Sequence, residues 1–282
     1  GDIRRLYDAM SDPEDDYPTI FFAEEYALNR KIKRYPKPYV ALYNGIVMGG
    51  GVGVSVHGSH RIATDRTVFA MPETGIGFFP DVGGAYFLPR LKDGLGAYMA
   101  LTGGRLDGGD CLAEGLADAY LPVERTDDLI RALAETGDVA SAIAAIATPA
   151  PEGRLAADRS AIARCFAQPR LADVIEALEA EGTEWAGKQL QAIRTKSPLA
   201  VAVAWEQMKR GADADFDECL KLEYRLALAS CDVGDFREGV RALIVDKDNA
   251  PKWRHARIED VEPEDVLRCF APPPVGDLAF TD

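Results

Sequence analysis

Hydrophobic residues in the first half of the chain form short runs separated by glycine and proline. An apolar run from Val40 to Met48 stops at three glycines, which predicts a buried strand followed by a tight turn and the start of a helix. Three further runs have the composition of short strands, and a loop is expected over residues 72–80. These runs cover residues 61–64, 67–71 and 119–123.

Helical spacing of apolar residues occurs on both sides of these strands. Residues 17–35 have helical periodicity, and Pro36 ends the pattern. Residues 82–104 are also helical in pattern, but Gly94-Leu-Gly96 breaks them into two pieces. In the first of these helices, the residues expected to face inward are Ile20, Phe21, Tyr26, Leu28 and Ile32.

The sequence changes character at Thr126, after which helical periodicity and alanine dominate. Helices are expected over residues 126–150, 155–180, 183–194, 198–210, 216–229 and 236–245. Short strands, turns and helices followed by helices alone predict an α/β fold: a coil of ββα units, without a doubly wound sheet, and a C-terminal helical region. The expected domains are therefore residues 1–125, carrying the active site, and residues 126–282.

The chain of 282 residues is acidic, with 32 basic against 46 acidic side chains and a formal net charge of −14. Such a charge repels nucleic acid and anionic membranes. No apolar run approaches the ~20 residues that a membrane-spanning helix needs. We therefore expect neither kind of partner, and a cytoplasmic protein, or one of the mitochondrial matrix if the source is eukaryotic.

Cysteine and histidine give no sign of a disulfide framework, a metal site or a catalytic triad. The five cysteines are odd in number, scattered and without a CxxC pair, which fits a reducing compartment. The three histidines occur in no HExxH motif, and no serine lies in a GxSxG motif. We therefore expect no metal ion, and we interpret the histidines as structural or surface groups.

The three glycines at positions 49–51 are the first candidate for chemistry. Glycine lets the backbone adopt a positive φ and approach a ligand closely, and the start of a helix offers N–H groups to a developing negative charge. Three glycines alone are more commonly only a tight turn, and the lack of a GxxxxGK[ST] motif argues against a nucleotide loop.

Two carboxylates follow in the loop after the strands. Glu73 has apolar or small neighbours on both sides, so partial desolvation would raise its pKa and make it a better base near neutral pH. Asp81 follows Pro80 and precedes a helical run, so an N-cap is as good an explanation as catalysis if it is judged alone. The glycine-containing loop between them allows both carboxylates to face one pocket.

Together these residues resemble the crotonase superfamily of coenzyme A thioester enzymes, in which a thioester oxygen lies between two backbone N–H groups. The resemblance extends over essentially the whole chain and implies a crotonase-type spiral fold. Besides the glycine turn and the Met-Pro-Glu loop, it rests on residues 21–29, 52–58, 79–84, 86–90, 216–220, 223–225, 236–243 and 246–248.

The resemblance implies an oxyanion hole formed by two glycines. The backbone N–H of Gly50 would be one donor, and the other would come from Gly1, which precedes the aspartate of a Gly-Asp-Ile-Arg sequence. A free amino terminus is not a peptide N–H, so we expect further chain ahead of Gly1, including the opening strands of such a fold.

Two positions favour hydrolysis over hydration within this superfamily. Hydratases have a glutamate a few residues after the glycine turn, where this chain has Gly53, and a small residue where it has Asp81. The resemblance therefore implies hydrolysis of a short-chain 3-hydroxyacyl-CoA thioester, with 3-hydroxyisobutyryl, an intermediate of valine breakdown, as the favoured acyl group. An enoyl-CoA hydratase or isomerase, and a non-catalytic assembly protein that binds CoA thioesters, are the alternatives.

The resemblance also suggests roles for individual side chains. Glu73 would be the primary catalytic carboxylate, as a nucleophile or as a general base, and the sequence does not choose between the two. Asp81 would orient water, share a proton with Glu73 or hold the substrate 3-hydroxyl. Glu25 would help to bind that hydroxyl, or else lie on a helix surface.

Substrate binding would use backbone and basic groups. Gly49 and Gly53 would contact substrate, and Arg4, with the basic residues at 31–37, would meet the CoA phosphates, although a solvated helix end is the commoner explanation for any one of these cations. Coenzyme A is then part of the substrate and no cofactor is required. Trimers or pairs of trimers are expected from analogy of fold alone.

Overall fold

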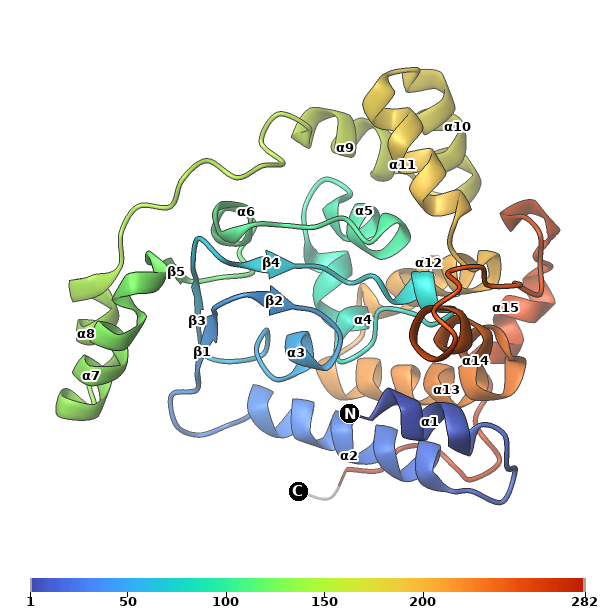
Figure 1. Ribbon diagram of the computed structural model, residues 1–282, viewed down its shortest axis with the longest axis horizontal. Helices are drawn as coiled ribbons and strands as arrows, with labels where there is room; N and C mark the ends of the chain where they lie inside the picture. The colour runs from blue at the N-terminus through green and yellow to red at the C-terminus, as the bar shows by residue number, and fades with distance from the viewer. Residues whose placement is uncertain (1, 281–282) are drawn as a thin grey trace. The chain divides into compact units, whose positions relative to one another are not determined.

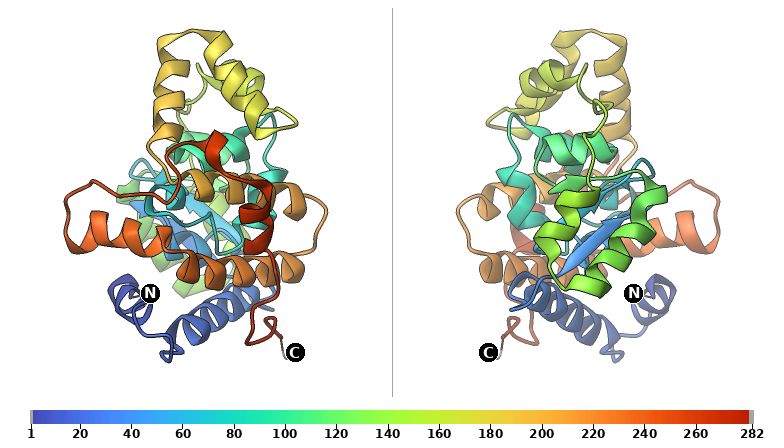
Figure 2. Two further views of the ribbon diagram at one scale, coloured as in Figure 1. Left: turned by 90° about the vertical axis from the view of Figure 1, so that its right-hand side faces the viewer. Right: turned by 90° about the vertical axis from the view of Figure 1, so that its left-hand side faces the viewer.

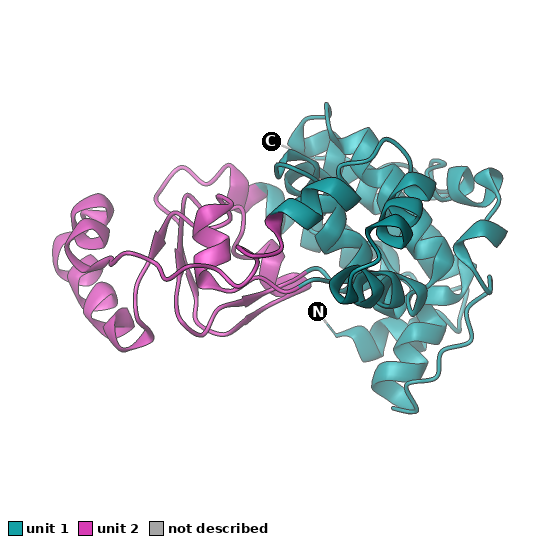
Figure 3. Cartoon of the chain, turned by 90° about the horizontal axis from the view of Figure 1, so that it is seen from above, with its two compact units in different colours: residues 1–30, 71–104, 160–282 teal, residues 31–70, 105–159 magenta. Residues whose placement is uncertain are grey.

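The computed structural model describes residues 2–280, which separate into two compact units (Figure 3). The first unit comprises residues 2–30, 71–104 and 160–280 of the described chain, and the second comprises residues 31–70 and 105–159. The units are interleaved along the sequence, because the chain leaves the first unit and returns to it twice.

Two small parallel sheets form the centre of the second unit (Figure 1). One contains β1 (Val40–Tyr43), β3 (His60–Ala63) and β5 (Ala119–Tyr120) in that order, and the other pairs β2 (Ile46–Val47) with β4 (Val68–Phe69). Each successive ββ segment adds one strand to each sheet, so the chain advances as a spiral of ββα units. The predicted α/β class is confirmed, and so are the three short strands after the glycine turn. The single strand predicted from Val40 to Met48 is instead two strands, β1 and β2, which belong to different sheets.

Helices complete the second unit. The short α3 (Gly50–Gly53) follows β2, and α6 (Gly108–Ala113) precedes β5. Beyond β5, α7 (Thr126–Thr136) and α8 (Val139–Ile146) form a hairpin, preceded by the single turn η3 (Val123–Arg125). The hairpin buries apolar side chains against the larger sheet in a cluster of Ile62, Leu121, Leu129, Ala142 and Ile146.

In the described part of the first unit, all regular secondary structure is helical. Two of its long helices, α12 (Pro198–Gly211) and α13 (Phe216–Val233), have Ser197 and Asp215 as N-caps, whose side chains accept backbone N–H groups of the first turn. The α10 and α11 helices pack as an antiparallel pair (Figure 2). The remaining bounds are α1 Ile3–Ala9, α2 Tyr17–Lys33, η1 Glu73–Ile76, α4 Gly84–Phe87, η2 Leu88–Arg90, α5 Leu95–Thr102, α9 Arg159–Phe166, α10 Leu171–Glu181, α11 Glu184–Arg194, α14 Asp235–Val240, η4 Arg241–Val245, η5 Ile258–Asp260 and α15 Pro263–Cys269.

The structure corrects the predicted inner face of α2. Ile20 and Leu28 are each 46% exposed, and the buried stripe includes Phe22, Tyr26 and Asn29. Apolar residues occur on both sides of this helix, so periodicity alone did not identify the buried side. The polar Asn29 belongs to the buried stripe, and counting only apolar residues therefore shifted the predicted face.

Two predicted helices are shorter than expected. The helix expected over residues 155–180 is broken between α9 and α10, where Pro169 lies. The helix expected over 126–150 is the α7–α8 hairpin, since Gly137 has a φ of +67° at the end of α7. The change in composition at Thr126 coincides with the start of α7, and a domain boundary there stays a prediction. No helix within residues 2–280 has both the length and the apolar character to cross a membrane.

Candidate active site

Glu73 is the first residue of the single helical turn η1 in the first unit, and it is 6% exposed. The turn ends at Gly77, whose φ of +71° is in the left-handed region. A Cβ at Gly77 would lie 2.3 Å from the carbonyl oxygen of Asp235, so only glycine allows this close packing. The backbone N–H of Ser197 also donates to the carbonyl of Thr74, over 3.2 Å. The Glu73 turn is thus fixed from two sides by residues distant in sequence.

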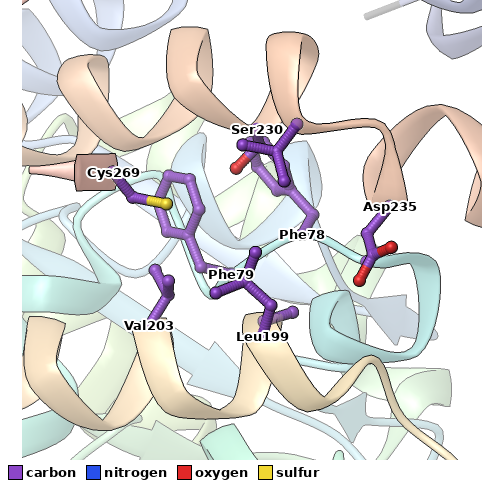
Figure 4. Close-up of a pocket in the computed structure, with 10 residues that line it drawn as sticks. Phe78, Phe79, Leu199, Val203, Ser230, Asp235 and Cys269 are labelled. Carbon is purple, nitrogen blue, oxygen red and sulfur yellow. The ribbon is translucent and has the colours of Figure 1, made fainter. Parts of the chain in front are cut away.

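The segment between the two predicted catalytic carboxylates is anchored by aromatic side chains. Phe78 and Phe79 lie in the interior between α12 and α13 (Figure 4), where they line a cavity of about 20 Å³. The ring of Phe78 is 4.4 Å from that of Phe236 and stacks on that of Phe22 at 5.7 Å. Because a packed aromatic interior resists displacement, this anchor holds the backbone on either side of it in place.

Asp81 is also 6% exposed and accepts a hydrogen bond at Oδ2 from the Tyr26 hydroxyl, over 3.1 Å. The backbone on both sides of Asp81 is held by buried side chains. Gln207 Nε2 donates to the carbonyl of Pro80 at 2.7 Å, and the Glu223 carboxylate accepts from the N–H groups of Gly83 and Ala85. The alternative prediction for Asp81, a helix N-cap, is wrong, because the residue preceding α4 is Gly83.

Several carboxylates influence Asp81 within the first unit. Burial raises the pKa of Asp81 well above its usual range, and the negative charges of Glu25, Glu73 and Glu223 raise it further. The Tyr26 hydrogen bond acts in the opposite direction, because it favours the ionised form of Asp81. Burial also raises the pKa of Glu25. The site therefore favours a proton on Asp81 in the presence of Glu73.

A cation lies near Glu73 in the same unit. Lys196 packs over Gly75, since its Nζ is 3.3 Å from the position that a Cβ on Gly75 would take. Burial lowers the pKa of Lys196, and the charge of Glu73 opposes that effect. The positive charge of Lys196 and the negative charge of Glu73 therefore stabilise each other in a partly buried setting.

The glycine turn is part of the second unit. Gly49 has φ of +53° and ψ of −131°, a combination that is essentially restricted to glycine. Gly50 begins α3, and within residues 2–280 its backbone N–H makes no hydrogen bond. Gly53 is buried near the end of this short helix. The turn therefore presents a backbone donor at Gly50, as an oxyanion hole requires, and the predicted donor at Gly1 lies outside the described residues.

The predicted CoA-binding cations lie on the surface. Arg4 is exposed in α1, where it pairs with Asp8 at 3.4 Å and lies over the Tyr7 ring. The basic residues of the predicted patch at 31–37 are exposed as well. Within the described chain, no three His, Cys, Asp or Glu side chains are arranged to hold a metal ion, and the five cysteines are free thiols.

Sequence reasoning missed three groups that act on the carboxylates: Tyr26, Lys196 and Glu223. Glu223 had a recognisable signal, because it is the one acidic or basic residue in the buried stripe of α13, and burying a charge is costly unless it has a role. Tyr26 was placed on the inner face without a role, and its partner Asp81 is 55 residues away. Nothing near Lys196 in the sequence indicates its proximity to Glu73.

Known proteins match this chain over nearly its full length. The family model described as enoyl-CoA hydratase/isomerase matches residues 1–270. The mitochondrial 3-hydroxyisobutyryl-CoA hydrolase of Danio rerio is 40% identical over 281 residues, which are 96% of this chain and 73% of that protein. The protein of the same name from Homo sapiens is 40% identical over 293 residues, which are 99% of this chain and 75% of the relative.

Solved structures agree on the fold. A carnitinyl-CoA dehydratase from Mycobacterium thermoresistibile has a TM-score of 0.92 at 42% identity, covering 98% of this chain and 80% of its own. An enoyl-CoA hydratase from Rhodobacter sphaeroides has a TM-score of 0.91 at 40% identity, covering 99% and 82%. Over nearly its whole length the chain is similar in sequence to 3-hydroxyisobutyryl-CoA hydrolases. This chain therefore belongs to the enoyl-CoA hydratase/isomerase family, that is, to the crotonase superfamily predicted from its motifs.

Proposed function

We propose that this chain is an acyl-CoA thioester hydrolase whose substrate is 3-hydroxyisobutyryl-CoA, released as 3-hydroxyisobutyrate and free CoA. One observation supports this most: Asp81, where hydratases carry a small residue, is a buried carboxyl with a raised pKa, influenced by Glu73. Two carboxyls that share a proton suit hydrolysis, in which water is activated and a thiolate leaves. The names of the relatives from Danio rerio and Homo sapiens support the same acyl group.

The oxyanion of the tetrahedral intermediate would be stabilised by backbone donors. Gly50 supplies one N–H, and Gly1 is assigned the second by resemblance to the superfamily. Such preorganised donors usually give the largest share of catalysis in acyl transfer, because loss of one costs on the order of 10²–10³ in rate.

Glu73 and Asp81 would divide the remaining chemistry. Glu73 either attacks the thioester carbonyl, displacing the CoA thiolate and giving a mixed anhydride that water then hydrolyses, or removes a proton from the water that attacks the carbonyl and displaces the thiolate. Asp81, which favours its protonated form, donates a proton to the leaving sulfur or shares it with Glu73. Lys196 offsets the negative charge at Glu73, and Glu25 binds the substrate 3-hydroxyl.

Binding would need no further group. The CoA phosphates are met by Arg4 and the exposed basic residues at 31–37, and the only partner in the reaction is the acyl-CoA itself. No cofactor or metal is proposed, nor a nucleic-acid or membrane partner. A homotrimer or hexamer is proposed by analogy of fold. The proposed location is the cytoplasm, or the mitochondrial matrix if the source is eukaryotic, since the names of the relatives include the word mitochondrial.

Hydration of an enoyl-CoA is the second candidate, because two solved structures similar to this one in fold are described as a dehydratase and a hydratase. Against it, Gly53 is buried and offers no carboxylate where hydratases carry their first glutamate. A hydratase would be left with Glu73 alone of its catalytic pair.

The test is the Glu73→Gln variant, assayed for thiol release from 3-hydroxyisobutyryl-CoA and for hydration of crotonyl-CoA. Thiol release by the variant should be about 10²–10⁴-fold slower than by the unaltered protein, which is the range that one general acid or base contributes. Glu24→Gln, an exposed position on α2, is the matched control and should keep full activity. Near-normal turnover by Glu73→Gln would remove Glu73 from the mechanism. If the unaltered protein hydrates crotonyl-CoA and releases no thiol from 3-hydroxyisobutyryl-CoA, the proposed hydrolysis is wrong and hydration takes its place.

A further inference from the structure

The turn that carries Asp81 has an unfavourable backbone conformation. Val82 has a φ of +50°, in the left-handed region that β-branched residues avoid. A residue held in this region is strained and persists there only when its surroundings impose the conformation. The conformation therefore depends on contacts from elsewhere in the fold, and such contacts also decide where the neighbouring Asp81 carboxyl lies.

Glu223 provides two of these contacts from α13. Its Oε2 accepts the N–H of Gly83 at 2.7 Å, and its Oε1 accepts the N–H of Ala85 at 2.8 Å. The Glu223 side chain is completely buried. Because α13 is a long helix fixed by its own core packing, the two carboxylate oxygens are presented to the turn from a rigid element.

A second buried side chain holds the other end of the turn. Gln207 of α12 donates from Nε2 to the carbonyl of Pro80 at 2.7 Å. Asp81 and Val82 thus lie between a fixed carbonyl at Pro80 and two fixed N–H groups at Gly83 and Ala85. In addition, α4 packs against both α12 and α13, so the turn is held between these helices.

The geometry requires a carboxyl group at position 223. Two N–H donors converge on one side chain, and each oxygen of a carboxyl group can accept one of them, whether or not the group carries a proton. Glutamine would offer one oxygen and one NH₂ group, so one backbone donor would face another donor. An apolar residue would leave both N–H groups buried without acceptors, which is unfavourable.

We propose that Glu223 is a positioning residue for the reaction: it holds the strained Val82 turn, and so places the Asp81 carboxyl in its working position without touching the substrate. This inference rests on the proposed function. A displacement of catalytic groups by about 1 Å can cost on the order of 10²-fold in rate. Glu223 therefore acts on the rate of reaction through Asp81 and leaves binding of the CoA portion nearly unchanged.

The alternative is that Glu223 only stabilises the fold. A double-mutant cycle with Asp81 separates the two roles, because a residue that acts through Asp81 has no further effect once Asp81 is removed. A loss of stability alone would instead lower the activity of both backgrounds by the same factor. Thermal unfolding of each variant shows whether the protein is folded at the assay temperature.

The cycle compares four proteins in thiol release from 3-hydroxyisobutyryl-CoA: the unaltered chain, Glu223→Gln, Asp81→Asn and the double variant. When Asp81 is present, Glu223→Gln should lower kcat by about 10²-fold and change KM by less than about 3-fold. In the Asp81→Asn background the same change should lower kcat by less than about 3-fold. Equal losses in both backgrounds, or a loss confined to KM, would overturn the inference.

Two controls match the Glu223→Gln change. Glu218→Gln makes the same substitution at an exposed position of the same helix, and Leu226→Val should lower stability from the buried face of α13 without removing a hydrogen bond to the turn. Both should keep kcat within about 2-fold of the unaltered chain. A fall in kcat for Leu226→Val as large as for Glu223→Gln would assign the effect to stability and contradict the inference.

Hydrogen exchange gives a readout that does not depend on the reaction. The Gly83 and Ala85 amides should be protected in the unaltered chain and should exchange faster in Glu223→Gln, whereas exchange of the α13 amides should be unchanged. If these amides stay protected in Glu223→Gln, the clamp itself is refuted. If the clamp is present but the unaltered chain releases no thiol from any 3-hydroxyacyl-CoA, it is the proposed function that fails.

Discussion

The Tyr26 hydroxyl donates a hydrogen bond to Asp81 Oδ2 over 3.1 Å, between two side chains that are 0% and 6% exposed. This bond favours the ionised carboxylate, whereas burial and the charges of Glu25, Glu73 and Glu223 favour the protonated acid. The balance favours the acid. Removing one partner at a time should therefore move the pKa of Asp81 in opposite directions, which tests whether Asp81 acts as a proton donor.

The Tyr26→Phe variant should move the alkaline limb of the kcat/KM profile to higher pH. Phenylalanine keeps the packing but removes the hydrogen bond that favours the ionised form, so the pKa of Asp81 rises and the acid survives to higher pH. Loss of the buried hydrogen bond should also cost about 1–3 kcal/mol of stability. A pH–rate profile from pH 5 to 10 measures the shift, and an unmoved limb would exclude Asp81 as its origin.

The Glu25→Gln variant should move the same limb to lower pH. Its negative charge raises the pKa of Asp81, and the neutral amide removes that effect while keeping the shape of the side chain. If Glu25 also binds the substrate 3-hydroxyl, KM should rise several-fold for 3-hydroxyisobutyryl-CoA and not for isobutyryl-CoA, which lacks that hydroxyl. A limb that moves upward would contradict the charge effect, and equal changes of KM for both thioesters would contradict the binding role.

The fold could be predicted from sequence where local signals and tertiary packing agree. The glycine turn after the run from Val40 is present as predicted, because Gly49 has a φ of +53°, but the run itself forms two strands, β1 and β2. The inner face of α2 could be predicted only in part: Tyr26 and Ile32 are buried as expected, but apolar Ile20 and Leu28 are exposed and polar Asn29 is buried. Which face is buried depends on what the helix packs against, and that information is not local.

The candidate site was predictable only for residues that lie in a motif. Glu73 and Asp81 were identified from their loop, and both are buried, while their catalytic role stays a prediction. Tyr26 and Glu223 contact the Asp81 turn from positions 55 to 140 residues away in sequence, so no local spacing indicates them. A charged residue within the apolar stripe of a helix was the one available signal, and it identifies Glu223.

Stability should fall as the pH rises from about 4.5 to 8, because Glu223 is buried. Burial raises its pKa from 4.5 to about 8, against the hydrogen bonds from Gly83 and Ala85, so in this window the native state keeps a proton that the unfolded state has lost. Each such proton changes the free energy of unfolding by about 1.4 kcal/mol per pH unit. The stabilisation is complete below pH 4.5 and is lost as the pH rises through 8.

The Glu223→Gln variant isolates this contribution. Its free energy of unfolding, measured by urea denaturation at pH 5, 6, 7 and 8, should decline less steeply than that of the unaltered chain, because the titrating group is gone. Glu218→Gln, exposed on the same helix, should keep the original slope. Identical slopes for the unaltered chain and Glu223→Gln would mean that Glu223 is ionised in the native state throughout this range.

The glycine turn offers a matched pair of substitutions that differ in backbone conformation. Gly49 has φ of +53° and ψ of −131°, so Gly49→Ala should cost about 1–3 kcal/mol and should displace the neighbouring Gly50 N–H. Gly51 is helical, and a Cβ there meets no atom within 4 Å, so Gly51→Ala should be neutral or stabilising by up to about 1 kcal/mol.

The same pair tests the oxyanion role of Gly50. If its N–H stabilises the tetrahedral intermediate, Gly49→Ala should lower kcat about 10²-fold or more at a temperature where the variant is folded, as loss of one such donor does in other enzymes. Gly51→Ala should leave kcat nearly unchanged, since it alters neither the φ of Gly49 nor the direction of the Gly50 N–H. Comparable kcat values for the two variants, with only the expected difference in unfolding temperature, would show that the turn has a structural role and that the oxyanion is stabilised elsewhere.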